Sequence, residues 1–139
     1  MIRLALLMLL ALASACDSQR ANATPRATAA SFADHKEARL LGVHVERGLL
    51  AAQPGVISTF ADQLVMADDA RAAIDDKLRV VEQRLVDADS SITALETATP
   101  DTWPARDAAT TTAMRRLEAA RDDAWEAVKA AHRAERRVM

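Results

Sequence analysis

The chain has 139 residues with a formal charge of −2, and half of them are hydrophobic, which is enough for one domain with a core. So small and mixed a charge argues against nucleic acid as a partner. A single cysteine excludes an intrachain disulfide. Alanine, the strongest helix former, occurs 32 times, whereas Phe and Trp occur twice each and Tyr is absent, so the composition predicts an all-α fold.

The N-terminal segment has the order of a secretory signal peptide. Arg3 precedes an uncharged, leucine-rich run over residues 4–12, and small residues follow at 13–15. The run is shorter than the ~20 residues that a membrane-spanning helix requires, so we do not expect a permanent transmembrane helix. The order predicts a signal peptide over residues 1–15, and a buried core helix is the alternative.

The end of this segment, Ala13-Ser14-Ala15-Cys16, resembles the lipobox of bacterial lipoproteins, although Ala13 stands where leucine is usual. The resemblance implies cleavage between Ala15 and Cys16, a diacylglyceryl group on the Cys16 thiol and an acyl chain, such as palmitate, on the new amino group. Two or three acyl chains suffice for stable anchoring. Asp17 resembles the signal that keeps enteric lipoproteins at the periplasmic face of the inner membrane. An ordinary secreted protein with a free thiol is the alternative.

A lipidated tether and one helical domain are expected after the cleavage site. Residues 16–30 are small and polar, contain Pro25 and lack periodicity, which is typical of a flexible tether. Over residues 31–139, apolar residues recur at helical spacing and predict helices at about 32–52, 56–98 and 103–137. Prolines and a glycine at 53–55 and 99–104 predict the breaks.

The predicted helix over residues 56–98 carries a seam of twelve positions spaced by three and four residues, from Ile57 to Leu95. Eleven are apolar, which indicates coiled-coil-like packing. Arg71 is the exception. Its guanidinium either snorkels or pairs near the open end of the bundle. The alternative is that it sets the register or binds a partner.

The helix over residues 103–137 carries an alanine stripe with Trp125 beside it. The short connection before it predicts an antiparallel hairpin with the helix over 56–98, on which the shorter helix over 32–52 packs. The expected architecture is therefore an antiparallel three-helix bundle. A turn centred near residues 101–102 predicts three ion pairs across the hairpin, and Leu78 in the layer of Trp125; the pairs are Lys77–Glu126, Glu82–Arg121 and Asp89–Arg115.

No constellation of residues in the sequence predicts catalysis. His35, His44 and His132 form no close pair, no glycine-rich phosphate loop is present, and adjacent carboxylates diverge on a helix. We therefore expect no enzyme activity, no cofactor and no metal.

The functional hypothesis is a lipid-anchored envelope adaptor or scaffold that binds another protein or self-associates, with Arg71 and Trp125 as candidate contacts. The alternative is a periplasmic carrier or sensor of a small apolar or metal ligand held between the helices.

Overall fold

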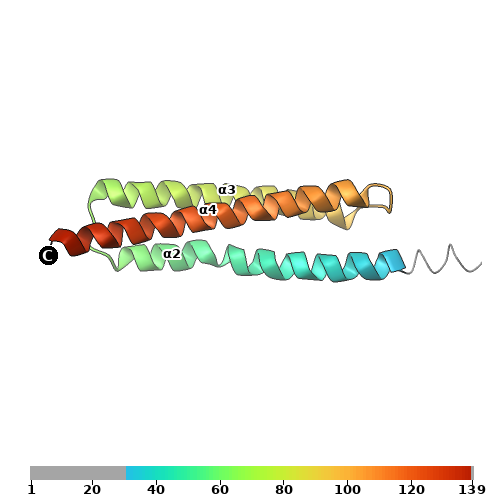
Figure 1. Ribbon diagram of the computed structural model, residues 1–139, viewed down its shortest axis with the longest axis horizontal. Coiled ribbons are helices and arrows are strands. Elements are labelled where there is room, and N and C mark those ends of the chain that lie inside the picture. Colours follow the sequence, from blue (N-terminus) through green and yellow to red (C-terminus); the bar gives the residue numbers. More distant parts are fainter. Residues whose placement is uncertain (1–30, 139) are drawn as a thin grey trace, which may run out of the picture. The chain divides into compact units, whose positions relative to one another are not determined.

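A computed structural model describes residues 31–138, and every element in that range is an α-helix (Figure 1), which confirms the predicted all-α fold. The chain divides after Arg39 into two compact units. Residues 31–39 of the first unit are helical. The cleavage site, Cys16, Asp17 and the tether lie outside the described residues.

Residues 40–62 form a single bent helical arm. Residues 40–51 are helical and lead through Ala52 into α2 (Gln53–Asp62). The predicted break at 53–55 is therefore wrong, because the chain only bends there. Pro54 lies in the first turn of α2, where a missing N–H leaves no hydrogen bond unmade. The Val56 N–H still donates to the Ala52 carbonyl at 3.4 Å, which keeps the two segments connected.

The predicted helix over residues 56–98 is interrupted, because the chain leaves helical geometry at 63–67 and α3 (Asp68–Glu96) begins after it. Gln63 and Leu64 donate backbone hydrogen bonds three residues back, which tightens the end of α2. Ala67 is extended and precedes Asp68 and Asp69, whose carboxylates suit the positive end of the α3 dipole. This connection reverses the chain.

A short turn joins α3 to α4 (Trp103–Val138), which begins at the predicted residue. The Thr102 hydroxyl accepts a hydrogen bond from the Thr99 N–H at 2.9 Å, and the Trp103 N–H donates to the Thr99 carbonyl at 2.8 Å. These bonds close the turn, so α3 and α4 lie side by side as a hairpin (Figure 1). The predicted three-helix bundle is thus formed by the arm, α3 and α4.

The register of the hairpin differs from the predicted one by nearly a helical turn. Lys77 Nζ lies 3.5 Å from Asp123 Oδ2, three residues before the predicted partner Glu126. Arg121, the second cation of the predicted register, binds Asp122 on its own helix at 2.6 Å. The reason is that α3 ends at Glu96, so the turn is centred earlier than the proline positions suggested.

The third predicted pair is replaced by a contact between the arm and α3. Arg47 donates two hydrogen bonds of 2.7 Å to the two carboxylate oxygens of Asp89, in place of the predicted Arg115. The guanidinium holds the pKa of Asp89 below its usual range, mainly through these bonds. Both side chains are partly exposed, so the bidentate geometry orients the arm more than it stabilises it.

The core lies between the arm, α3 and α4. Its fully buried members come from all three: Val43, Ile57, Ile74, Val81, Leu95 and Leu117. Thr110 is the buried polar residue, and its hydroxyl lies 3.1 Å from the Ser91 carbonyl and 3.0 Å from the Arg106 carbonyl. Within the described part of the chain, every buried side-chain nitrogen or oxygen has a hydrogen-bond partner.

Truncating the core should destabilise the domain. Leu117 is completely buried, so we expect Leu117→Ala to lower the free energy of unfolding by about 2–5 kcal/mol through lost contacts and the cavity left behind. Urea unfolding followed by circular dichroism measures the difference. Val86→Ala is the control because Val86 is 62% exposed, and its effect should stay within about 0.5 kcal/mol. Equal effects of the two substitutions would contradict this core.

Candidate binding site at the loop end of the bundle

An apolar groove of about 550 Å³ lies where the chain passes from α2 to α3. The connection contributes Val65, Met66 and Ala67, and the first turn of α3 contributes Asp69 and Ala70. The last turns of α4 form the opposite wall with Ala131, Ala134 and Glu135. Alanines on both walls leave the groove open because their side chains end at Cβ.

The groove opens to solvent over an apolar surface. Val65 is 79% exposed, and Ala67 and Ala134 are exposed as well. Met66 is half-buried and packs on the core, so a side chain of adaptable shape lines the groove at this point. Val65 and Met66 therefore make this side of the groove apolar.

Two carboxylates border this groove. The Asp69 carboxylate accepts a hydrogen bond of 2.8 Å from the Ala70 N–H, so it completes the start of α3. Glu135 is only 16% exposed and lies 3.6 Å from His132 Nδ1 on the preceding turn. Neighbouring groups therefore hold both carboxylates in place beside the apolar lining of the groove.

Arg71 links the two sides of the connection between α2 and α3. Its guanidinium binds Asp62 at the end of α2 and also Asp75 one turn further along α3, with Nε 3.2 Å from Asp75 Oδ1. These two carboxylates raise the pKa of Arg71, with the Asp62 hydrogen bond as the largest cause. The structure thus gives the seam's single charged residue an internal contact across the break between α2 and α3.

Trp125 joins α4 to α2. Its indole ring meets Phe60 edge-on, with ring centroids 5.9 Å apart and an interplanar angle of 69°. Its Nε1–H donates to Gln53 Oε1 at 3.4 Å. Trp125 and Leu78, which were predicted to share a layer, are both half-buried against the core. Neither Trp125 nor Arg71 lines the groove, so the structure does not bring the two predicted contacts together in it.

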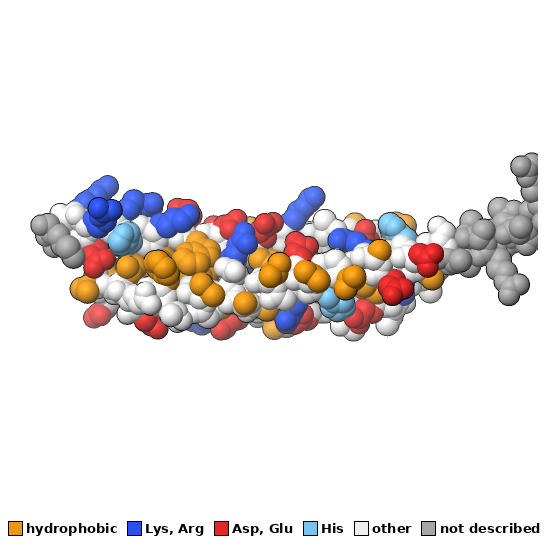
Figure 2. Space-filling model, turned by 90° about the horizontal axis from the view of Figure 1, so that it is seen from below, with side chains coloured by type: hydrophobic (Ala, Val, Ile, Leu, Met, Phe, Trp, Pro, Cys, Tyr) orange, Lys and Arg blue, Asp and Glu red, His pale blue; other side chains and the backbone are white. Residues whose placement is uncertain are grey.

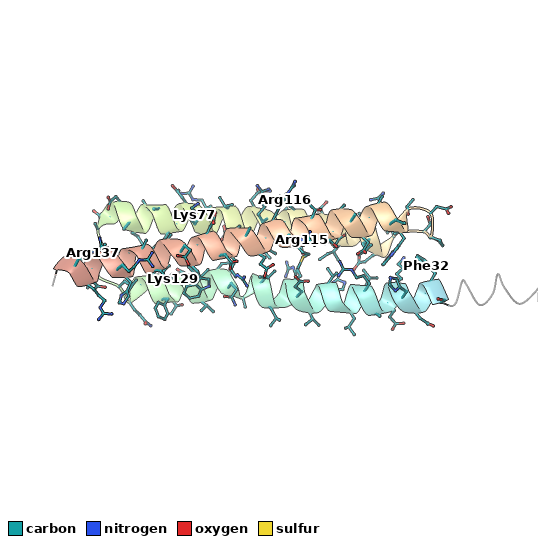
Figure 3. The ribbon with its side chains drawn as sticks, in the orientation of Figure 1. Phe32, Lys77, Arg115, Arg116, Lys129 and Arg137 are labelled. Carbon is teal, nitrogen blue, oxygen red and sulfur yellow. The ribbon has the colours of Figure 1, made fainter. Side chains whose placement is uncertain are left out.

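Basic residues gather on the same end of the bundle. Lys129 and Arg137 lie on the C-terminal turns of α4 (Figure 3), near the connection between α2 and α3 in Figure 1. Lys129 binds Glu126 at 2.8 Å, and this hydrogen bond is the largest cause of the lowered pKa of Glu126. Arg136 and Arg137 are in the last turn, where positive charge suits the helix dipole.

The histidines do not converge. His44 Nε2 lies 3.1 Å from Glu96 Oε1, and His132 lies beside Glu135. Among the residues that the structure describes, no group of three His, Cys, Asp or Glu residues could hold a metal ion. No helix between residues 31 and 138 is long and apolar enough to cross a membrane.

Comparisons with protein-family models, with curated proteins and with solved structures found no match for this chain.

Removing the Arg71 guanidinium should loosen the connection between α2 and α3. We expect Arg71→Met to speed amide hydrogen exchange at residues 62–67 by several-fold, because Asp62 loses its partner across the break. Hydrogen exchange read by mass spectrometry checks this. Arg79→Met is the matched control, since Arg79 binds Asp76 on its own helix. Unchanged exchange at 62–67 in Arg71→Met would rule out this function for Arg71.

Proposed function

We propose that this protein is a lipid-anchored, non-catalytic adaptor of the bacterial envelope, and that its groove receives an apolar helix of another envelope protein. The observation that carries the proposal is the groove itself. It has a volume of about 550 Å³, an apolar lining and a largely exposed valine at its edge. A helix can lay apolar side chains into such a groove at successive turns.

The charges of the described residues support binding over catalysis. The lowered pKa values of Asp89 and Glu126 come from hydrogen bonds to Arg47 and Lys129, and neither ion pair lines the groove. A catalytic site brings perturbed groups together in a cleft. The adaptor reading therefore fits the positions of these groups better.

The membrane part of the proposal comes from the N-terminal sequence. Cleavage after Ala15 would leave Cys16 as the acylated N-terminus, and Asp17 would favour retention at the inner membrane, on its periplasmic face. Several acyl chains would hold the domain at the surface without a spanning helix.

A second candidate function is the carriage of a small apolar ligand. The volume of the groove falls within the range of about 300–1,000 Å³ that small-molecule sites occupy. Such sites bury most of the ligand surface, whereas the exposed Val65, Ala67 and Ala134 leave this groove open on one side. The openness favours a protein helix as occupant.

Substitution of the acylated residue tests the anchor. We expect Cys16→Ala to abolish incorporation of labelled palmitate and to release the chain from the membrane or leave an uncleaved precursor, because the thiol is the attachment point. Metabolic labelling followed by membrane fractionation measures both effects. Asp17→Ser should keep the label and change only the membrane in which the protein is found. Continued labelling of Cys16→Ala would refute the anchor.

Filling the groove tests the adaptor site. A photo-crosslinking amino acid in place of the exposed Val65 should give one discrete protein adduct in cells, and Ala134→Trp in the same chain should reduce it at least about five-fold by occupying the groove. Ala119→Trp is the matched control, an exposed alanine of α4 outside the groove.

A purified-protein measurement separates the two candidate functions. The apolar fluorophore N-phenyl-1-naphthylamine should bind the adaptor weakly, whereas saturable micromolar binding that Ala134→Trp removes would favour the carrier. An adduct of equal yield in Ala119→Trp and Ala134→Trp would show that the groove is not the site.

A further inference from the structure

The outer side of the arm carries a continuous apolar stripe that is largely exposed in the described part of the chain. We call the outer stripe the residues Leu41, Val45, Leu49, Ala52, Val56 and Phe60. Leu41 and Leu49 are each 67% exposed, and the other large members are about half exposed. Figure 2 shows hydrophobic side chains in a line along this face. Its extent points to a contact with another molecule.

Glycines border the stripe and leave room for close approach. Gly42, Gly48 and Gly55 fall beside it on the helix, and a Cβ added at any of them would meet no atom within 4 Å. Glycine weakens a helix, and packing among residues 31–138 gives no reason for it at these three positions. A second helix against the stripe does give a reason, since the missing side chains let two backbones come near each other.

The stripe is uncharged, and several of the charges beside it are paired within the chain. His44 contacts Glu96, Arg47 binds Asp89, and Asp62 binds Arg71. The occupant must therefore present an uncharged apolar face. Another copy of the outer stripe has that property, because it brings no unpaired charge to the centre of the contact.

The spacing of the stripe reads the same in both directions. Its six positions are separated by four, four, three, four and four residues, with the centre between Leu49 and Ala52. An antiparallel second copy therefore places Leu41 against Phe60, Val45 against Val56 and Leu49 against Ala52. Because the centre lies away from Glu46, the two copies of Glu46 are separated by about nine residues, or roughly 13 Å along the helix, and do not oppose each other.

We propose that the outer stripe is the interface of an antiparallel homodimer of this protein. The area fits: if each of the six side chains contributes roughly 60–100 Å², two copies bury on the order of 1,000 Å², which is the lower bound for a specific interface. A two-fold axis through the centre of the stripe closes the assembly at two copies. The interface shares no residue with the groove, so the failure of one proposal would leave the other untouched.

Disulfide trapping in membranes tests the geometry with the full chain. One copy carries Val45→Cys and a second, differently tagged copy carries Val56→Cys. The two copies are co-expressed and oxidised with copper phenanthroline. We expect a disulfide between the two tagged copies, because the antiparallel alignment places these positions opposite each other. Val45→Cys alone should form none, since its counterpart is about eleven residues or roughly 16 Å away along the helix. The parent chain, with Cys16 only, gives the background.

A charge in the stripe tests the association itself. Val45→Glu should raise the dissociation constant of the detergent-solubilised protein about ten-fold or more in sedimentation velocity, because two buried valine contacts are lost per dimer. Val86→Glu, an exposed valine of α3 outside the stripe, should leave the dimer unchanged. Far-UV circular dichroism checks that both variants fold.

Each other occupant has a distinct outcome. Disulfides in Val45→Cys alone would indicate parallel packing and overturn the proposal. If the parent chain is monomeric and the thiol of Val45→Cys is protected from a water-soluble alkylating reagent only when lipid vesicles are present, the stripe binds the membrane and the proposal is overturned too. A monomeric parent chain with residue 45 accessible throughout would also refute the dimer.

Discussion

The hairpin of α3 and α4 needs a third helix to close its core, and the arm supplies it. Val43, Leu50 and Ile57 follow one another at intervals of seven along the arm and are 0–5% exposed, so each enters the layer that α3 and α4 leave open. The bend at Ala52, the reversal at 63–67 and the Arg47–Asp89 contact all serve this docking. If the arm left, a strip of core along both helices of the hairpin would meet water.

Much of this bundle could be predicted from local patterns. Alanine content gave the fold class, and Pro100 and Pro104 gave the start of α4. The spacing of threes and fours also picked out residues that are buried, among them Ile57, Ile74 and Leu95. It could not show the break at 63–67, because the repeat runs through it without a glycine or proline. Asp68-Asp69 was the available signal, since paired carboxylates favour the first turn of a helix.

The candidate site was harder to predict than the fold because it depends on that break. Arg71 stood out as a charge in an apolar seam, but its role follows from Asp62, which only a reversed chain brings beside it. Trp125 stood out by size, and the structure gives it Phe60 and Gln53 as neighbours. The groove is walled by residues such as Met66 and Ala131 that carry no chemical motif. A site made of small apolar side chains becomes visible only when the chain is folded.

The alanine-rich core has a thermodynamic consequence. Several of the buried apolar residues are alanines, at positions 61, 88, 98, 120, 124 and 131, and each removes little surface from water. The heat-capacity change of unfolding scales with the apolar area exposed, so this domain should fall below the usual ~12–15 cal/mol/K per residue. Its stability curve would then be shallow, with the free energy of unfolding varying slowly with temperature. Such a domain keeps its shape over a wide thermal range without a large maximum stability.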